Sequence, residues 1–268
     1  MDHAPALPRS VLLALWLAEP GPGSGPVQRT LDAVQGDDEP HRVLVGDAAV
    51  PGLTDVVAGP GGPTLADLVA AWGSGPRTVA AVLPAPGDPA GAPAAVAGPA
   101  QAAGEAVLVS TPGGDFAAVP EVERFGSVYE AGHLVTWRVH AVPAWRTALV
   151  GHVGTLADAE RDLASALTRA TEALVALDVA RWREDAAERI AALRTPPDLR
   201  PLVPPGLEPR RVRVLGTALR LRAIIDLATA DDGAAVNLWQ ADQRSTALRD
   251  VDRAARRALA AATHPGPG

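Results

Sequence analysis

Two groups of polar residues have types and spacing that could support chemistry. The first lies on an expected strand, His133–Val142, where Arg138 and His140 alternate with apolar residues and therefore share one face. An arginine can hold a carboxylate or phosphate through two parallel hydrogen bonds, and a histidine can transfer a proton near neutral pH. The same face could equally be the solvated side of an antiparallel sheet, which is normally polar.

The second group surrounds a turn expected between two helices. Carboxylate and amide oxygens are ligands for Mg²⁺ and Ca²⁺, and paired carboxylates can act as acid and base. The spacing lacks the EF-hand pattern, however, and an Asp-Asp-Gly turn is an ordinary helix ending. We therefore predict that these residues are candidates for binding a ligand and that they hold no metal ion: Asp231, Asp232, Asn237, Trp239 and Arg244.

The composition excludes several classes of enzyme. The chain has no cysteine, and all 24 of its basic residues are arginines, as is typical of proteins from high-GC bacterial genomes. Without cysteine there is no thiolate nucleophile, cysteine-ligated zinc or iron–sulfur cluster, and without lysine there is no Schiff base or P-loop lysine. The motifs HExxH and GxSxG and a strand-to-helix GxGxxG are also missing. We therefore expect no cofactor, and the sequence names no catalytic residue.

The charge pattern argues against nucleic acid as a partner. The net charge is −7, and the excess of acids lies in the first 150 residues. Phosphate binding requires a surplus of exposed positive charge. The arginines of residues 209–230 are better explained by pairing with acids of neighbouring helices: Arg210, Arg211, Arg213, Arg220 and Arg222.

A short apolar run, Val11–Ala18, bears on the location of the protein. It is far shorter than the span of about 20 residues that crosses a bilayer. It could be part of an export signal, but Asp2 and the lack of a clear cleavage site favour a buried helix. We therefore expect a cytoplasmic protein that does not bind membranes.

The first 150 residues predict a small, mainly antiparallel sheet with flanking helices. Apolar and β-branched runs between turn signals predict strands at Arg42–Val45, Thr78–Leu83, Ala106–Ser110, Phe116–Val119, Gly126–Tyr129 and His133–Val142. Helices are expected at Pro8–Ala18, Pro26–Gln35 and Leu65–Trp72, the last opened by a capping box of Thr64 and Asp67.

The remaining residues predict helices. Apolar residues recur at three- and four-residue steps from Leu156 to Leu193, with a kink expected near Asp178–Trp182. Two more helices are expected, from Pro209 to about Ala230 and from about Ala235 to Thr263, and residues 264–268 are expected to be a disordered tail. Because residues 209–230 carry apolar side chains on more than one face, that helix should be buried from two sides.

The sequence as a whole predicts an α+β protein with two domains. Residues 1–150 form an acidic α+β domain rich in proline and glycine, and residues 151–268 form a helical hairpin or three-helix bundle. The broad apolar faces favour a non-enzymatic interaction or regulatory protein that forms a homo-oligomer or binds a protein partner through its helical half. The alternative is a small-ligand-binding protein or enzyme, in which Arg138 and His140 meet the Asp231–Arg244 group between the sheet and the bundle.

Overall fold

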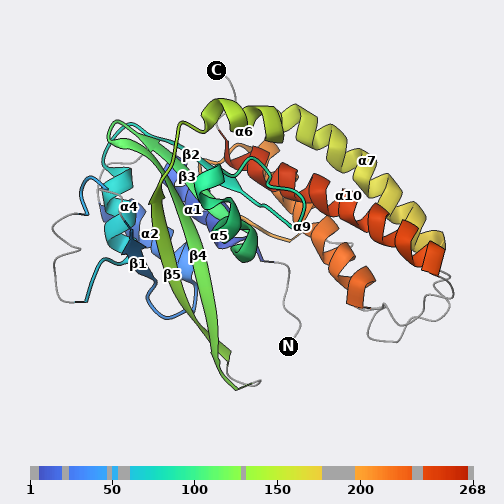
Figure 1. The fold of residues 1–268 in the computed structure, drawn as a ribbon, viewed down its shortest axis with the longest axis horizontal. Coiled ribbons are helices and arrows are strands. Elements are labelled where there is room, and N and C mark those ends of the chain that lie inside the picture. Colours follow the sequence, from blue (N-terminus) through green and yellow to red (C-terminus); the bar gives the residue numbers. More distant parts are fainter. Residues whose placement is uncertain are drawn as a thin grey trace. The chain divides into compact units, whose positions relative to one another are not determined.

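The computed structural model describes residues 6–19, 24–46, 50–53, 61–127, 131–176, 197–230 and 238–264. It confirms the α+β class, since a five-stranded sheet with flanking helices is followed by long helices (Figure 1). The chain divides into two compact units. The sheet unit consists chiefly of Pro8–Val153 with Leu202–Gly206, and the helical unit chiefly of Gly154–Pro201 and Leu207–Ala262.

The sheet is mainly antiparallel, as expected. Its strands lie in the order β1 (Arg42–Val45), β5 (Ala131–Ala141), β4 (Gly114–Gly126), β3 (Ala106–Thr111) and β2 (Thr78–Val82). β1 runs parallel to β5, and the other neighbouring pairs are antiparallel. The short β1 pairs with β5 only from Thr136 to Val139, so the first part of β5 forms an open edge among the described strands.

Helices cover both faces of the part of the sheet formed by β2, β3 and β4. α1 (Arg9–Ala18) packs on β2 and β3 and against α2 (Ser24–Gln35), and its residues from Ser10 to Leu17 are buried. This confirms that the apolar run near the start of the chain is a buried helix. The opposite face is covered by α5 (Ala97–Ala103), which follows the 3-10 turn η1 (Ala94–Val96) and packs on β4 (Figure 1).

Strand β4 is longer than predicted, because Pro120 does not end it. The prediction that one strand ends at Val119 and another begins at Gly126 is therefore wrong. β3 pairs with β4 only as far as Ala118, so β4 has a single bonded neighbour at Pro120. A proline, which lacks an amide hydrogen, is tolerated at such an edge. The resulting β4–β5 hairpin extends beyond the rest of the sheet (Figure 1).

Two further helices belong to the sheet unit. α4 (Leu65–Gly73) packs against α2 and begins with the predicted capping box, in which the Thr64 amide and hydroxyl donate to Asp67 Oδ2 at 2.8 and 2.7 Å. α6 (Arg146–Val153) was not predicted. It runs through residue 150, the predicted domain boundary.

The described part of the helical unit contains α7 (Leu156–Ala176), α9 (Pro209–Ala230) and α10 (Leu238–Thr263). α7 packs on α9, where Arg210 pairs with Glu160 at 2.7 Å, and Arg211 donates to the carbonyl of Ala262 at the end of α10. The expected pairing of the α9 arginines with neighbouring helices is therefore confirmed for Arg210. The kink expected near Asp178–Trp182 and the tail beyond His264 lie outside the described residues.

Helix α9 is buried around more than half of its circumference, as its apolar pattern predicted. The buried side chains are spread over successive turns and do not form a single stripe: Val214, Leu215, Ala218, Leu219, Leu221, Ile224 and Ile225. None of the described helices is both long enough and apolar enough to cross a membrane.

Candidate functional site

Strand β5 carries polar side chains to both faces of the sheet, because successive residues of a strand point in opposite directions. His133 and Trp137 point to one face, and Arg138 and His140 to the other. The first face holds a hydrogen-bonded group that we call the Asp38 cluster, consisting of Arg9, Asp38, His41, His133 and Trp137.

Asp38 is the acceptor at the centre of this cluster. Arg9 donates to its Oδ2 through Nε at 3.2 Å and through a terminal nitrogen at 2.5 Å. His133 Nδ1 lies 3.0 Å from Oδ1, and His41 Nε2 lies 3.4 Å from Oδ2. The indole Nε1 of Trp137 donates to His41 Nδ1 at 3.2 Å. One carboxylate therefore joins α1, the segment before β1, and β5.

Burial and charge set the protonation of this cluster. Desolvation of the fully buried His41 lowers its pKa to about 4, although the hydrogen bond to Asp38 opposes that shift. Burial alone would raise the pKa of Asp38, but the hydrogen bond and charge of Arg9, together with both histidines, bring it below its usual value. At neutral pH, Asp38 is therefore a carboxylate and His41 a neutral imidazole.

These protonation states define what the cluster can do chemically. Both ring nitrogens of His41 are occupied, by Trp137 and Asp38, so this residue holds the fold together and is not available to a substrate. His133 is one-third exposed, and its contact with Asp38 orients the ring as in an Asp–His pair. Among the described residues, no group of three or more acidic or histidine side chains is arranged to hold a metal ion.

The other face of the outer strands is exposed, and we call it the open face. Cross-strand partners point to the same side of a sheet, so the register assigns its members. The buried Val119, opposite Arg138, marks the end of this face, and its other members come from β1, β4 and β5: Arg42, Leu44, Glu121, Glu123, Phe125, Leu134, Thr136 and Arg138. All except the partly buried Thr136 are exposed, and Phe125 lies across Gly132, where a Cβ atom would be 2.4 Å from the ring.

The two predicted residues of β5 have different surroundings. Arg138 lies on the open face, where its guanidinium pairs with Glu121, and this pairing raises the pKa of Arg138. His140 lies further along the strand, opposite the buried Ala117, and its Nε2 is buried without a hydrogen-bond partner in the part of the chain that the structure describes. That Arg138 and His140 bind one ligand together therefore stays a prediction.

The second predicted group cannot be placed on the structure. Asp231, Asp232 and Asn237 lie outside the described residues. Trp239 and Arg244 belong to α10, but the described part of that helix does not include their side chains. The expected meeting of this group with β5 stays a prediction.

Comparison with known protein families gives matches to both units. The model of the N-terminal domain of Rv1486c-like proteins matches residues 10–150, and that of the C-terminal domain matches residues 157–260. The chain belongs to the Rv1486c-like protein family. The family is thus described by two domain models, and on this chain the first match ends at residue 150 and the second begins at residue 157. Neither a search of curated proteins nor one of solved structures found a match.

Sequence reasoning on this Rv1486c-like chain missed Arg9, Asp38 and His41. Asp38 lies 95 residues before His133 and within an acidic stretch, 37–39, that resembles an ordinary surface loop. The one available signal was His41 directly before an apolar strand, where a buried histidine must find hydrogen-bond partners.

Proposed function

We propose that this member of the Rv1486c-like family is a non-enzymatic interaction protein of the cytoplasm that forms a homodimer through the open face. The supporting observation is the clustering of exposed apolar side chains. Leu44, Phe125 and Leu134 are 48, 44 and 45% exposed on adjacent strands of this face. Phe125 and Leu134 lie at neighbouring positions of β4 and β5, and Leu44 lies beside Arg138 further along the face. Exposed apolar side chains bordered by polar ones are typical of protein interaction sites.

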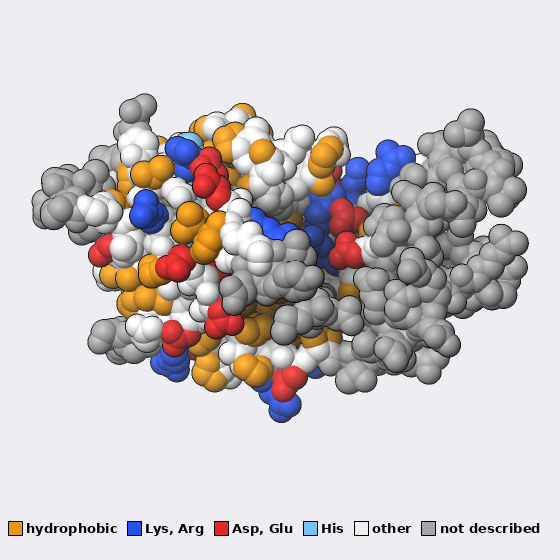
Figure 2. Space-filling view, turned by 90° about the horizontal axis from the view of Figure 1, so that it is seen from below, with side chains coloured by type: hydrophobic (Ala, Val, Ile, Leu, Met, Phe, Trp, Pro, Cys, Tyr) orange, Lys and Arg blue, Asp and Glu red, His pale blue; other side chains and the backbone are white. Residues whose placement is uncertain are grey.

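A second copy of the chain is the occupant that the charges favour. The open face carries two arginines, Arg42 and Arg138, and two glutamates, Glu121 and Glu123, so its formal charge is zero on a chain of charge −7. A two-fold contact places the same patch on both partners. The arginines of one copy, Arg42 and Arg138, can therefore face the glutamates of the other, Glu121 and Glu123. Figure 2 shows one side of the molecule on which acidic and basic side chains are mixed with apolar ones.

The helical half is a second place where a partner could bind. Its apolar faces led to that expectation, but in the structure α9 uses much of its apolar surface within the chain. Binding through the helical half therefore stays a prediction. The open face has the stronger support, because its apolar residues are exposed.

Replacing Leu134 with glutamate is expected to separate the dimer into monomers. A two-fold interface would bury two unpaired carboxylates, which should weaken association at least tenfold. Sedimentation velocity or light scattering on the full-length protein measures the mass. Because Leu134 is exposed, the variant should keep the far-UV circular dichroism of the original protein.

Val150→Glu is the matched control for this experiment. Val150 is an apolar residue of similar exposure, 39%, but it lies on α6 and not on the open face. This variant should remain dimeric. A monomeric original protein at tens of micromolar, or equal masses for Leu134→Glu and the original protein, would show the proposal to be wrong.

A further inference from the structure

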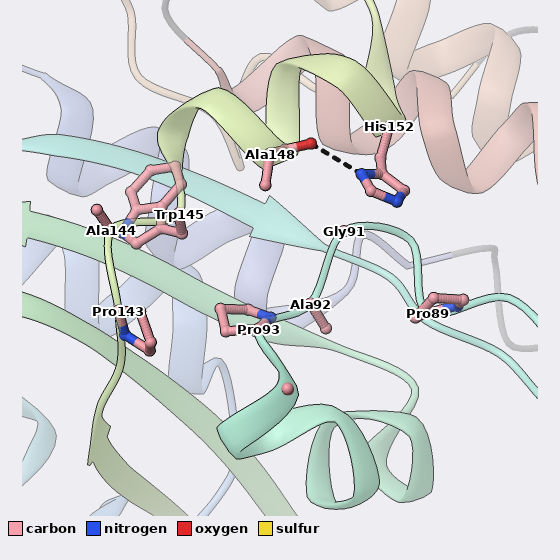
Figure 3. Close-up of a pocket in the computed structure, with 10 residues that line it drawn as sticks. Pro89, Gly91, Ala92, Pro93, Pro143, Ala144, Trp145, Ala148 and His152 are labelled. Atoms are coloured by element: carbon pink, nitrogen blue, oxygen red, sulfur yellow. Dashed lines mark hydrogen bonds between the residues drawn. The ribbon is translucent and has the colours of Figure 1, made fainter.

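A groove lies beside α6, outside both the Asp38 cluster and the open face. One wall is formed by the loop before η1, and the other by the segment that leads into α6 (Figure 3). The cavity measures about 250 Å³. The residues that determine its chemistry are Pro89, Pro93, Pro143, Trp145, Ala148 and His152.

The loop wall is held in a fixed conformation at an energetic cost. Backbone hydrogen bonds join Ala85 and Asp88 in both directions, at 2.9 and 2.8 Å. Ala90 has a φ of +48°, which is unfavourable for a residue with a side chain. Gly91 follows with a φ of +80°, and a Cβ atom there would lie 3.1 Å from Leu149 Cδ1. The loop thus approaches α6 more closely than another residue would allow.

The lining is apolar and formally uncharged apart from one histidine. His152 Nδ1 lies 2.8 Å from the carbonyl oxygen of Ala148, which can only accept, so Nδ1 carries the proton (Figure 3). In the neutral ring, Nε2 is therefore a hydrogen-bond acceptor. The buried Trp145 contributes ring surface to the lining, since its indole nitrogen is inaccessible to solvent.

We infer that this groove binds a neutral aromatic small molecule of one or two rings that carries an N–H or O–H donor. A buried cavity of about 150 Å³ is enough to hold benzene, so the groove has room for a larger ring system. A charged ligand would lose hydration without an ionic partner in the lining. The donor of the ligand would bond to His152 Nε2, while its ring packs against the prolines.

Indole and 1-methylindole are the matched probes for this site. Both have the same ring system, but only indole has an N–H. In ligand-observed NMR titrations of the full-length protein, we expect saturable binding of indole and about fivefold weaker binding of 1-methylindole, because a hydrogen bond is lost. Absence of saturable binding of indole up to its solubility, or equal binding of the two probes, would overturn the inference.

Two variants localise the binding. Ala148→Leu places a larger side chain in the groove from an exposed position and should abolish indole binding, whereas Val150→Leu on the same helix lies outside the lining and should leave it unchanged. His152→Phe keeps an aromatic ring but removes the acceptor, so the preference for indole over 1-methylindole should disappear. Indole binding that persists in Ala148→Leu would exclude this groove. Because the groove does not include the open face, the Leu134→Glu variant should bind indole normally.

Discussion

Replacing Arg77 with methionine is expected to lower the free energy of unfolding of the sheet unit by about 3 kcal/mol. The Arg77 guanidinium donates hydrogen bonds to the carbonyl oxygens of Leu17 and Glu19 at the end of α1, and to those of Gly73 and Gly75 at the end of α4. Leu17 and Gly73 lie in the last turns of their helices, where carbonyls lack an intrahelical partner, and a cation there also opposes the negative end of the helix dipole. Methionine fills the space but leaves these acceptors unsatisfied.

Urea unfolding followed by circular dichroism measures this loss. Arg146→Met is the control, because Arg146 is exposed at the start of α6 and should contribute less than about 0.5 kcal/mol. Arg77→Lys should give an intermediate loss, since one ammonium group cannot span four carbonyls. If Arg77→Met were as stable as Arg146→Met, the role of Arg77 in joining the two helix ends would be refuted.

Acidification from pH 6.5 to pH 4 is expected to cost the sheet unit about 3 kcal/mol of stability through His41 alone. Burial lowers the pKa of His41 from 6.5 in the unfolded chain to about 4 in the fold. Between these values the unfolded chain binds a proton that the folded chain does not, so stability falls as the pH falls. The contribution of His41 is fully present above pH 6.5.

Asp38 acts in the same direction at lower pH. Its pKa is also lowered in the fold, so its contribution is present above its ordinary pKa of 3.8 and is lost as the pH falls below that value. The two groups together predict that acid weakens the attachment of α1 and β5 to the segment between them.

His41→Gln tests the origin of this pH dependence. Glutamine can accept from Trp137 and donate to Asp38 but does not titrate, so the slope between pH 6.5 and pH 4 should become much shallower. His152→Gln, at an exposed histidine, should retain the slope of the original protein. Retention of the full slope in His41→Gln would show that another group causes it.

The elements of this protein were largely predictable because their signals are local. The alternation of Val135, Trp137 and Val139 identified the buried side of β5, and all three are buried. The Thr64–Asp67 pair predicted the start of α4, and Thr64 donates to Asp67 as expected. Strand β4 escaped prediction because the effect of Pro120 depends on which neighbours the strand has at that residue.

The candidate sites were less predictable, for a related reason. The prediction that Arg138 and His140 bind a ligand relied on their shared strand face, but the residues that surround each part of that face are distant in sequence. Arg138 remains exposed beside Glu121, whereas His140 lies in the covered part of the strand. The groove beside α6 depends on a loop held against a helix that begins more than fifty residues later.

The sequence by itself determined the α+β class, most of the helices and strands, and the exclusion of cysteine and lysine chemistry, because periodicity, capping and composition act within a few residues. Only the tertiary structure decided that Asp38 joins Arg9, His41 and His133, that Arg77 caps two helices, and that apolar residues of three strands form one open face. Those arrangements depend on strand register and on contacts across long stretches of chain, which no local pattern of residue types specifies.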